Sequence, residues 1–332
     1  MTSPSGDPGF SGSPYSPEAF EPSYPQPPRP AKFQSRKAIH LILFVVTLLT
    51  ATRAGYLHYL PYVADWGRAD RALVEAVTIW HGLWYSLAII AILGAHEMGH
   101  YFACRRYNVD ASLPYFLPLY LSTSLTYLQT GTLGAVIRIR EAFPTRRVLF
   151  DIAIAGPIAG FLVLLPVLFA GLSMSKVVQI PSDPTGIVVW IGEPLLYKGA
   201  RWLILGPLGP GQDVNWHPLV FAAWFGMLAT AINLLPFGQL DGGHITYAAL
   251  GRLSTPISIA TVSTAVIFTF VAPSWILMTV IMVLMLLILG PRHPRVIYEY
   301  EPLGRVRQGL AVLALIMLII CFTPVPFSLM GQ

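Results

Sequence analysis

The chain has 332 residues, of which 55% are hydrophobic and only 11% are charged, and its mean hydropathy is +0.61. Soluble domains carry about 25% charged residues, so this composition excludes an ordinary soluble protein and indicates an integral membrane protein whose surroundings are the lipid bilayer. The formal charge of +5 does not indicate a nucleic-acid partner, because the basic residues cluster just outside apolar runs. Two widely separated cysteines predict no disulfide framework.

Residues 1–36 are rich in proline, serine and glycine and contain too few apolar side chains to form a core. We expect a disordered, solubilising tail; the alternative is that its Tyr-Pro-Gln-Pro-Pro-Arg-Pro stretch docks onto an aromatic groove. The first apolar run begins only at Ile39, which is too late for an ordinary cleaved signal peptide. This run is therefore expected to remain as a membrane anchor.

Seven apolar runs follow, each near the roughly 20 residues that a helix needs to cross a bilayer. They lie at about residues 38–56, 80–104, 150–172, 218–235, 256–272, 275–289 and 309–323. The fifth and sixth runs are short and are joined by Ala272-Pro273-Ser274, so this pair is either a tight hairpin or a kinked, partly embedded pair. The predicted fold is an all-α polytopic membrane protein with about seven transmembrane helices, six at the fewest.

The distribution of basic residues predicts the orientation of these spans. Arg29, Lys32, Arg36 and Lys37 precede the first span, which places the N-terminus in the cytoplasm. Seven spans threaded from there put most other lysines and arginines on the same side and the C-terminus outside. The outer loop, about residues 173–217, is rich in glycine and proline and is expected to hold no inserted domain.

Residues 107–145, between the second and third runs, are apolar but interrupted by prolines and glycines, which makes them a poor helix. The stretch GTLGAVIRIR, residues 131–140, ends in the alternation of a strand. An open strand cannot face lipid, so we predict a re-entrant β-like segment at the surface or in a protein-lined cavity. The alternative is a cytoplasmic hairpin whose arginines anchor the membrane edge.

The motif HEMGH, residues 96–100, lies inside the second apolar run. His96 and His100 are four residues apart, so on a helix they share one face and can hold one zinc ion. Glu97 lies about 100° around the helix, where it is badly placed as a ligand but can act as a general base on a water. The alternative is a hydrogen-bonded pair of buried histidines with a paired glutamate, which is disfavoured because burying three such groups in hydrocarbon is costly.

Zinc needs at least one more protein ligand, and Asp241 is the strongest candidate because it lies in a polar stretch after an apolar span. In the seven-span arrangement the second and fourth spans run in the same direction. His96, His100 and Asp241 then lie roughly 8 to 16 Å from their cytoplasmic anchors, so they can meet at one depth. His244, one turn beyond Asp241, is a weaker candidate that could support a ligand.

With HEMGH in one span and Leu-Asp-Gly in a later one, the chain resembles the site-2 protease family of intramembrane zinc metalloproteases. The resemblance also rests on GTLGAVIRIR, on DIAIAGPIAG at residues 151–160, and on the pattern Asn-x-x-Pro-x-x-x-Leu-Asp-Gly, which is matched by Asn233, Pro236, Leu240, Asp241 and Gly242. It implies that His96, His100 and Asp241 bind Zn²⁺ and that Glu97 activates water. It further implies that Asn233 positions the substrate backbone or stabilises the oxyanion. Family members often carry a PDZ or CBS domain, for which this chain shows no room.

The resemblance and the site chemistry agree on hydrolysis of a peptide bond within the membrane, in a transmembrane helix of a protein substrate. Family analogy implies a bacterial cytoplasmic membrane, an upstream protease that trims the substrate first, and an adaptor as a further candidate partner. The alternatives are a zinc transporter and an inactive relative that acts as a scaffold. The expected domains are a cytoplasmic tail (1–36), a first span with its outer loop (37–80), a catalytic core (81–251) and additional helices (252–332).

A transmembrane helix must be unwound before a protease reaches its backbone, and the exposed amides then need partners. We therefore expect residues 132–139 to form an edge strand near the zinc that pairs with the substrate, with glycines allowing close backbone approach. The candidate substrate-binding residues are Gly131, Thr132, Leu133, Gly134, Ala135 and Val136, together with Asn233 and Pro236.

Overall fold

The structure, a computed structural model, describes residues 36–65, 69–120, 129–180, 189–290, 293, 296–299 and 302–329. All of these residues belong to one unit, Phe33–Gln332. The expected disordered tail lies outside the described residues, apart from Arg36.

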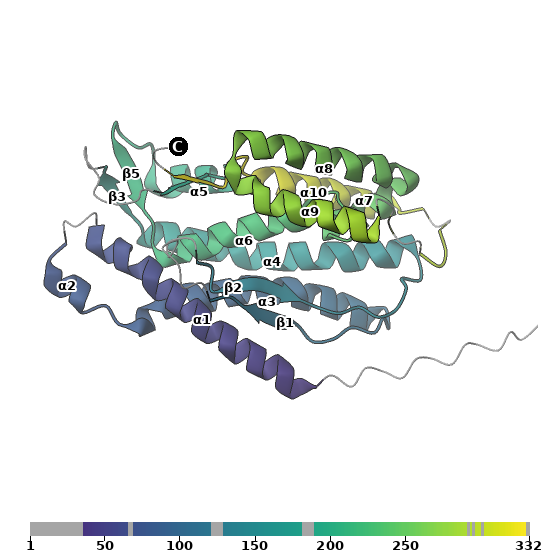
Figure 1. The fold of residues 1–332 in the computed structure, drawn as a ribbon, viewed down its shortest axis with the longest axis horizontal. Coiled ribbons are helices and arrows are strands. Elements are labelled where there is room, and N and C mark those ends of the chain that lie inside the picture. The colour runs from purple at the N-terminus through teal and green to yellow at the C-terminus, as the bar shows by residue number, and fades with distance from the viewer. Residues whose placement is uncertain are drawn as a thin grey trace, which may run out of the picture. The chain divides into compact units, whose positions relative to one another are not determined.

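The described part of the chain is mainly helical (Figure 1). The helices are α1 (Lys37–Ala64), α2 (Arg71–Glu75), α3 (Leu83–Arg106), α4 (Arg146–Met174), α5 (Leu195–Leu205), α6 (Pro218–Leu234), α7 (Asp241–Leu250), α8 (Ser254–Val271), α9 (Ile276–Leu289) and α10 (Arg305–Cys321). The strands are β1 (Tyr115–Pro118), β2 (Thr132–Val136), β3 (Lys176–Gln179), β4 (Val189–Ile191), β5 (Gln212–Asn215) and β6 (Phe327–Leu329). They form the antiparallel pairs β1–β2, β3–β5 and β4–β6.

Each of the seven apolar runs is helical in the structure. Among the described residues, four stretches are long and apolar enough to cross a membrane: Lys37–Ala64, Ile79–Arg106, Arg146–Met174 and Asp241–Val271. Two further apolar helices, Pro218–Leu234 and Pro273–Ile288, are shorter. The prediction of a mainly helical, polytopic membrane protein is confirmed, whereas the number of seven crossings stays a prediction.

Helices α3, α4 and α6 lie side by side (Figure 1) and form the part of the fold that carries the candidate site. The side chain of Thr145 accepts a hydrogen bond from the Val148 N–H and so caps the start of α4, and Pro218 stands at the first position of α6. Gly99 brings α3 close to α4, because a Cβ there would lie 2.4 Å from the Ala155 carbonyl oxygen. Larger side chains at this position would therefore separate the two helices.

The predicted strand is present as β2, although it ends at Val136, earlier than expected. It pairs with β1 in an antiparallel hairpin, and α1 packs against that hairpin. Gly131, which precedes β2, has φ +70° and lies so close to Ala51 of α1 that a Cβ would be 2.4 Å from its Cα. Four side chains of α1 hold the hairpin. His40 Nδ1 lies 3.0 Å from Pro114 O, and the Thr50 hydroxyl donates to Gly131 O at 2.6 Å. Arg53 donates to Gln129 Oε1 at 2.8 Å, and His58 Nε2 lies 3.0 Å from Gln129 O.

An ion pair joins α10 to the start of α4. Arg307 donates to both carboxylate oxygens of Asp151, at 2.7 and 2.6 Å, and the Tyr107 hydroxyl donates to Asp151 at 2.5 Å. The hydrogen bond to this carboxylate raises the pKa of Tyr107 above its ordinary value. Three segments that are distant in sequence are therefore held together at one end of the helix bundle.

The outer loop, which was expected to hold no inserted domain, contains α5 as well as β3, β4 and β5. Tyr197 and Ala200 of α5 are buried against a cluster that includes Leu168 and Leu172 of α4. The indole of Trp216 donates to the Tyr197 hydroxyl at 2.7 Å. Helical spacing of apolar residues in LLYKGARWLIL indicates this helix, but the surrounding glycines and prolines obscure the pattern.

Candidate metal centre

Helix α3 carries both histidines of HEMGH on one face, as their spacing predicts. His96 and His100 are each 6% exposed, and their Nε2 atoms lie 3.1 Å apart. Glu97 is 8% exposed and lines the same cavity. Three groups that can bind a metal or a proton are therefore buried together in the middle of an apolar helix.

Asp241 reaches the two histidines from the first position of α7. Its Oδ2 lies 3.1 Å from His96 Nε2 and 3.3 Å from His100 Nε2. The chain leaves α6 after Leu234 and turns back tightly, since a Cβ at Gly242 would lie 2.1 Å from the Leu234 carbonyl oxygen. The glycine after Asp241 thus allows α7 to begin close to the end of α6, which brings the carboxylate to the histidines.

Helix α4 orients the ring of His100. The Nδ1 of His100 lies 2.7 Å from the carbonyl oxygen of Ile152. A carbonyl only accepts, so Nδ1 carries the proton and Nε2 is left to face His96 and Asp241. Gly156 lies against the same ring, and a Cβ there would be 2.1 Å from His100 Nε2. Backbone and glycine together fix the ring nitrogen that a metal would use.

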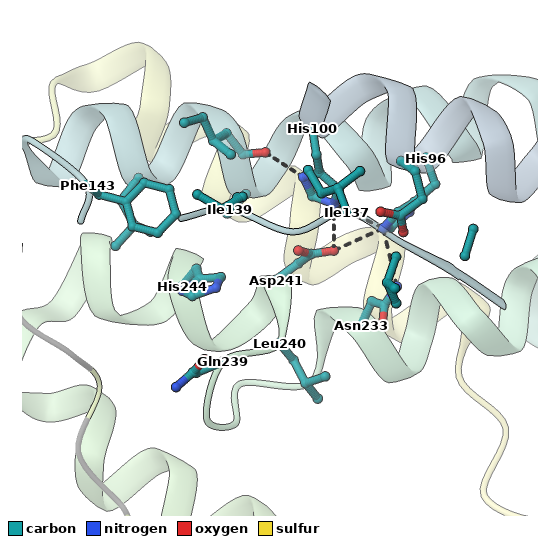
Figure 2. Close-up of a pocket in the computed structure, with 16 residues that line it drawn as sticks. His96, His100, Ile137, Ile139, Phe143, Asn233, Gln239, Leu240, Asp241 and His244 are labelled. Carbon is teal, nitrogen blue, oxygen red and sulfur yellow. Dashed lines mark hydrogen bonds and ion pairs between the residues drawn. The ribbon is translucent and has the colours of Figure 1, made fainter. Parts of the chain in front are cut away.

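The amide of Asn233, at the end of α6, also reaches the centre. Its Nδ2 lies 3.3 Å from His96 Nε2, and its side chain lines the cavity. Figure 2 shows Asn233 beside His96, with Asp241 between Asn233 and His244. The cavity encloses about 240 Å³, which is room for a short extended segment of peptide.

The cavity includes some of the residues predicted to bind substrate and excludes others. Ala135, Val136 and Asn233 line it, whereas Gly131, Thr132, Leu133, Gly134 and Pro236 do not. Pro236 instead lies in the turn between α6 and α7, where its carbonyl accepts a 3.3 Å hydrogen bond from Ser258.

Eight residues of the wall were not named as site residues from the sequence, although the first two lie within the predicted edge strand: Ile137, Ile139, Phe143, Leu149, Ile152, Ala153, Gln239 and Leu240. A signal existed for two of them, because alternation with the exposed Arg138 and Arg140 predicts that Ile137 and Ile139 point inward.

The backbone after β2 faces the centre. The N–H groups of Arg138 and Arg140 donate toward Ser112 Oγ and Asp110 O, at 2.9 and 3.3 Å. In extended chain the intervening amides point the other way, so those of Ile137 and Ile139 face away from residues 110–112. The backbone of Ile137 interacts with the Glu97 carboxyl group. The edge of this segment is thus directed at the groups of HEMGH.

His96, His100 and Asp241 form a donor set that suits zinc. One ligand atom from each lies within 4.8 Å of the others, and this is the only such group among the described histidines, cysteines, aspartates and glutamates. Two imidazole nitrogens and a carboxylate oxygen are common zinc ligands, and three protein ligands leave a position for water or substrate. The structure therefore brings together the three residues that the sequence proposed.

Comparisons with known proteins place this site in a family. The family model described as "Peptidase family M50" matches residues 84–277. The chain is 34% identical over 256 residues to "Probable zinc metalloprotease EGY2, chloroplastic" of Oryza sativa subsp. indica, covering 74% of this chain and 44% of that protein. It is 33% identical over 260 residues to the Arabidopsis thaliana protein of the same name, covering 76% and 43%.

The chain spans less than half the length of these curated relatives. No solved structure matches it. The family match covers more than half of the chain and contains the histidines, the glutamate and the aspartate of the candidate centre. The chain therefore belongs to peptidase family M50, the site-2 protease family that its motifs resemble.

Proposed function

We propose that the chain is an intramembrane zinc metalloprotease that cleaves a transmembrane helix of a membrane protein. His96, His100 and Asp241 are the zinc ligands and Glu97 is the general base in this proposal. The observation that carries it is the convergence of the three ligand atoms within 4.8 Å of one another, in a cavity that Glu97 also lines. Membership of family M50 and the names of the relatives support the same activity.

Each side chain of the cavity has a separate role in the proposed hydrolysis. Zinc supplies Lewis-acid chemistry when it is bound, polarising the scissile carbonyl and acidifying the attacking water. Glu97 takes a proton from that water and returns it to the leaving amine. The Asn233 amide can donate a hydrogen bond to the substrate carbonyl or to the oxyanion that develops from it. The apolar wall, which includes Ile152 and Ala153, excludes other water.

The segment that follows β2 is proposed to hold the substrate in an extended form. An unwound substrate exposes N–H and C=O groups that need partners in a low-dielectric site. The amides of Ile137 and Ile139 face away from residues 110–112, and both residues line the cavity. A substrate that adds as a strand along this edge would pass beside Glu97. This placement supports a re-entrant hairpin over one that only anchors the membrane edge.

The proposal includes an orientation and a set of partners. Seven spans with a cytoplasmic N-terminus are supported by the basic residues that precede α1 and by the arginines near the start of α4 and α10. A bacterial cytoplasmic membrane, an upstream protease and an adaptor are proposed from family analogy alone.

The test separates metal binding from catalysis. Purified full-length chain should contain one zinc; Asp241→Ala should lose most of it, since an open site with two imidazoles binds weakly. Glu97→Gln should keep the zinc and lose cleavage, which proteomics of membrane fragments can detect in cells that carry the wild-type chain or this variant. Unchanged zinc in Asp241→Ala would remove Asp241 from the site. Identical fragments with wild type and Glu97→Gln, or zinc flux into vesicles without cleavage, would contradict the protease.

A further inference from the structure

A second pair of histidines lies beside the candidate metal centre. His244, on the first turn of α7, lines the cavity, and its Nδ1 lies 2.5 Å from Nε2 of His293. His293 follows α9 and lies beyond residue 277, where the family match ends. A residue from outside the family-matched region therefore orients a side chain of the cavity wall.

Packing on α7 fixes the position of His293. Its ring is stacked on that of Tyr247, with centroids 4.3 Å apart and an interplanar angle of 12°. The Tyr247 hydroxyl donates to Glu299 at 2.9 Å, so the same tyrosine also holds the chain that follows His293. With its ring held in this way, His293 presents Nε2 to His244 in one direction.

Backbone hydrogen bonds join the same segment to the wall of the cavity. The N–H groups of Ile297 and Tyr298 donate to the carbonyls of Phe143 and Pro144, at 3.1 and 2.9 Å. Phe143 lines the cavity and meets the ring of His244 edge to face, with centroids 5.8 Å apart. Residues 297 and 298 thus hold the segment that carries Phe143, a neighbour of the His244 ring.

The location of His244 defines what it can contact. Figure 2 shows Asn233 and His244 on opposite sides of Asp241, with His244 between Asp241 and Phe143. Residues 137 and 139 extend along the same cavity. A peptide that lies along this edge would meet Asn233 on one side of the metal ligands and His244 on the other.

We propose that His244 hydrogen-bonds a backbone group of the unwound substrate on the side of the scissile bond away from Asn233, with His293 as its positioning residue. The proposal rests on the proposed protease function. With Nδ1 engaged by His293, the imidazole of His244 has one ring nitrogen left, which donates in one tautomer and accepts in the other. Either form pairs with one of the N–H or C=O groups that unwinding exposes, and each such group is costly when unpaired in a dry site.

The experiment uses the full chain with zinc in detergent micelles. The probe is a synthetic peptide with about 20 apolar residues, a central Gly-Ser pair, and a fluorophore and quencher at its ends. His244→Phe should lower kcat/KM about tenfold while zinc content holds, because one hydrogen bond to the substrate is lost. His244→Gln, which keeps a hydrogen-bonding group, should recover part of the rate. His81→Phe, a matched change outside the cavity, should leave cleavage unchanged.

A double-mutant cycle tests the role of His293. His293→Phe keeps a ring that can stack on Tyr247 but removes the hydrogen bond, so kcat/KM should fall less than in His244→Phe. The double variant should be no slower than His244→Phe, because His293 acts through His244. A further set of probes carries an ester in place of one backbone amide next to the mapped scissile bond. At one of these positions the ester should slow cleavage by the wild-type chain but cause no further loss in His244→Phe.

The outcomes separate this inference from the function on which it rests. If wild type leaves the probe intact, or if Glu97→Gln cleaves it equally well, the proposed function fails. If wild type cleaves and Glu97→Gln does not, an unchanged kcat/KM in His244→Phe overturns the inference. Loss of zinc from His244→Phe also overturns it, since His244 would then act on the metal centre. Additive losses in the double variant would remove His293 as the positioning residue.

Discussion

Gly156 and Gly160 lie on the face of α4 that meets the two histidines of HEMGH. A Cβ at Gly156 would lie 2.1 Å from His100 Nε2, whereas one at Gly160 would lie 3.1 Å from His96 Cβ. The first distance is far inside van der Waals contact and involves the nitrogen that faces Asp241. The second needs only a shift of a few tenths of an ångström. The two glycines therefore differ in how strongly they constrain the candidate metal centre.

We predict that Gly156→Ala loses most of its zinc, while Gly160→Ala loses little. The added methyl group must displace the His100 ring or push α3 from α4, and overpacking of this kind costs about 1–3 kcal/mol. Metal analysis of the purified variants and their melting temperatures would measure both effects. Gly309→Ala in α10 is the matched control, because a Cβ there has nothing within 4 Å. Equal zinc in all three variants would show that the methyl group is accommodated without moving a ligand.

The residues of the candidate centre were predictable to different degrees. Helical spacing indicated His96, Glu97 and His100, and the expected depth of Asp241 after a parallel span indicated the third candidate ligand. The carbonyl of Ile152 that orients His100 could not be found, because any residue type supplies a carbonyl. His293 was missed since it lies 49 positions from His244 and no motif connects them.

The segment of β2 and the residues after it is the element on which substrate binding is proposed to depend. Proline has no N–H to donate, so a proline scan through Leu133, Ala135, Val136 and Ile137 removes one backbone donor at a time. We predict losses of cleavage that alternate in severity, with Ile137→Pro the most severe because its backbone also interacts with Glu97.

Zinc content should hold across this scan, and Ile137→Ala, which keeps the N–H, should cleave more efficiently than Ile137→Pro. Cleavage of the quenched single-span peptide would be the measurement. Uniformly normal cleavage in every proline variant would exclude strand addition and leave the hairpin as a membrane-edge anchor.

At the scale of elements, hydrophobic run length predicted where helices occur better than where they end. Helix α1 continues to Ala64, about two turns past the expected end at residue 56. Its extra turns carry aromatic residues, and Tyr62 donates to the carbonyl of Met174 at 2.8 Å, a tertiary contact that a local pattern does not reveal. The alternation in GTLGAVIRIR indicated a strand. Its partner β1 gives no such signal, because it directly follows Pro114, ends at Pro118 and shows no clear period.

The arrangement of the whole molecule bears on which residues lie on the same side of the membrane. Arg307 meets Asp151 near the start of α4, whereas Tyr197 and Ala200 pack near its end against Leu168 and Leu172. The start of α10 and helix α5 therefore lie at opposite ends of a 29-residue apolar helix. That separation agrees with the orientation proposed from the basic residues.

We predict that Arg305→Cys reacts with a membrane-impermeant maleimide from the side of the N-terminus, and Lys198→Cys from the opposite side. Both native residues are exposed, and the background would carry alanine at the buried Cys104 and Cys321. Labelling after permeabilisation provides the control for reactivity. Reaction of both cysteines from one side of intact membranes would show that the proposed number of crossings is wrong.

The number of crossings was the least predictable property of the whole chain. Helices α8 and α9 are joined at Pro273–Trp275, and the sequence left them as a hairpin or an embedded pair. Val262 and Ala265 of α8 and Met282 of α9 are buried in a small cluster with Phe237. Hydropathy alone indicates that such helices prefer lipid to water. How deeply they enter the membrane depends on neighbouring helices and on the bilayer.

The contacts between α1 and the β1–β2 hairpin determine which fragments of the chain would keep the hairpin in place. The family match starts at residue 84, whereas Thr50, Arg53 and His58, which hold Gln129 and Gly131, precede it. A fragment that starts at residue 84 would retain the three candidate ligands and the general base, yet it would lack the helix on which the hairpin rests. Such a fragment should bind metal without recognising a helix to cut. Under the proposed function, the smallest fragment that cleaves a substrate would therefore be larger than the region by which its family is recognised.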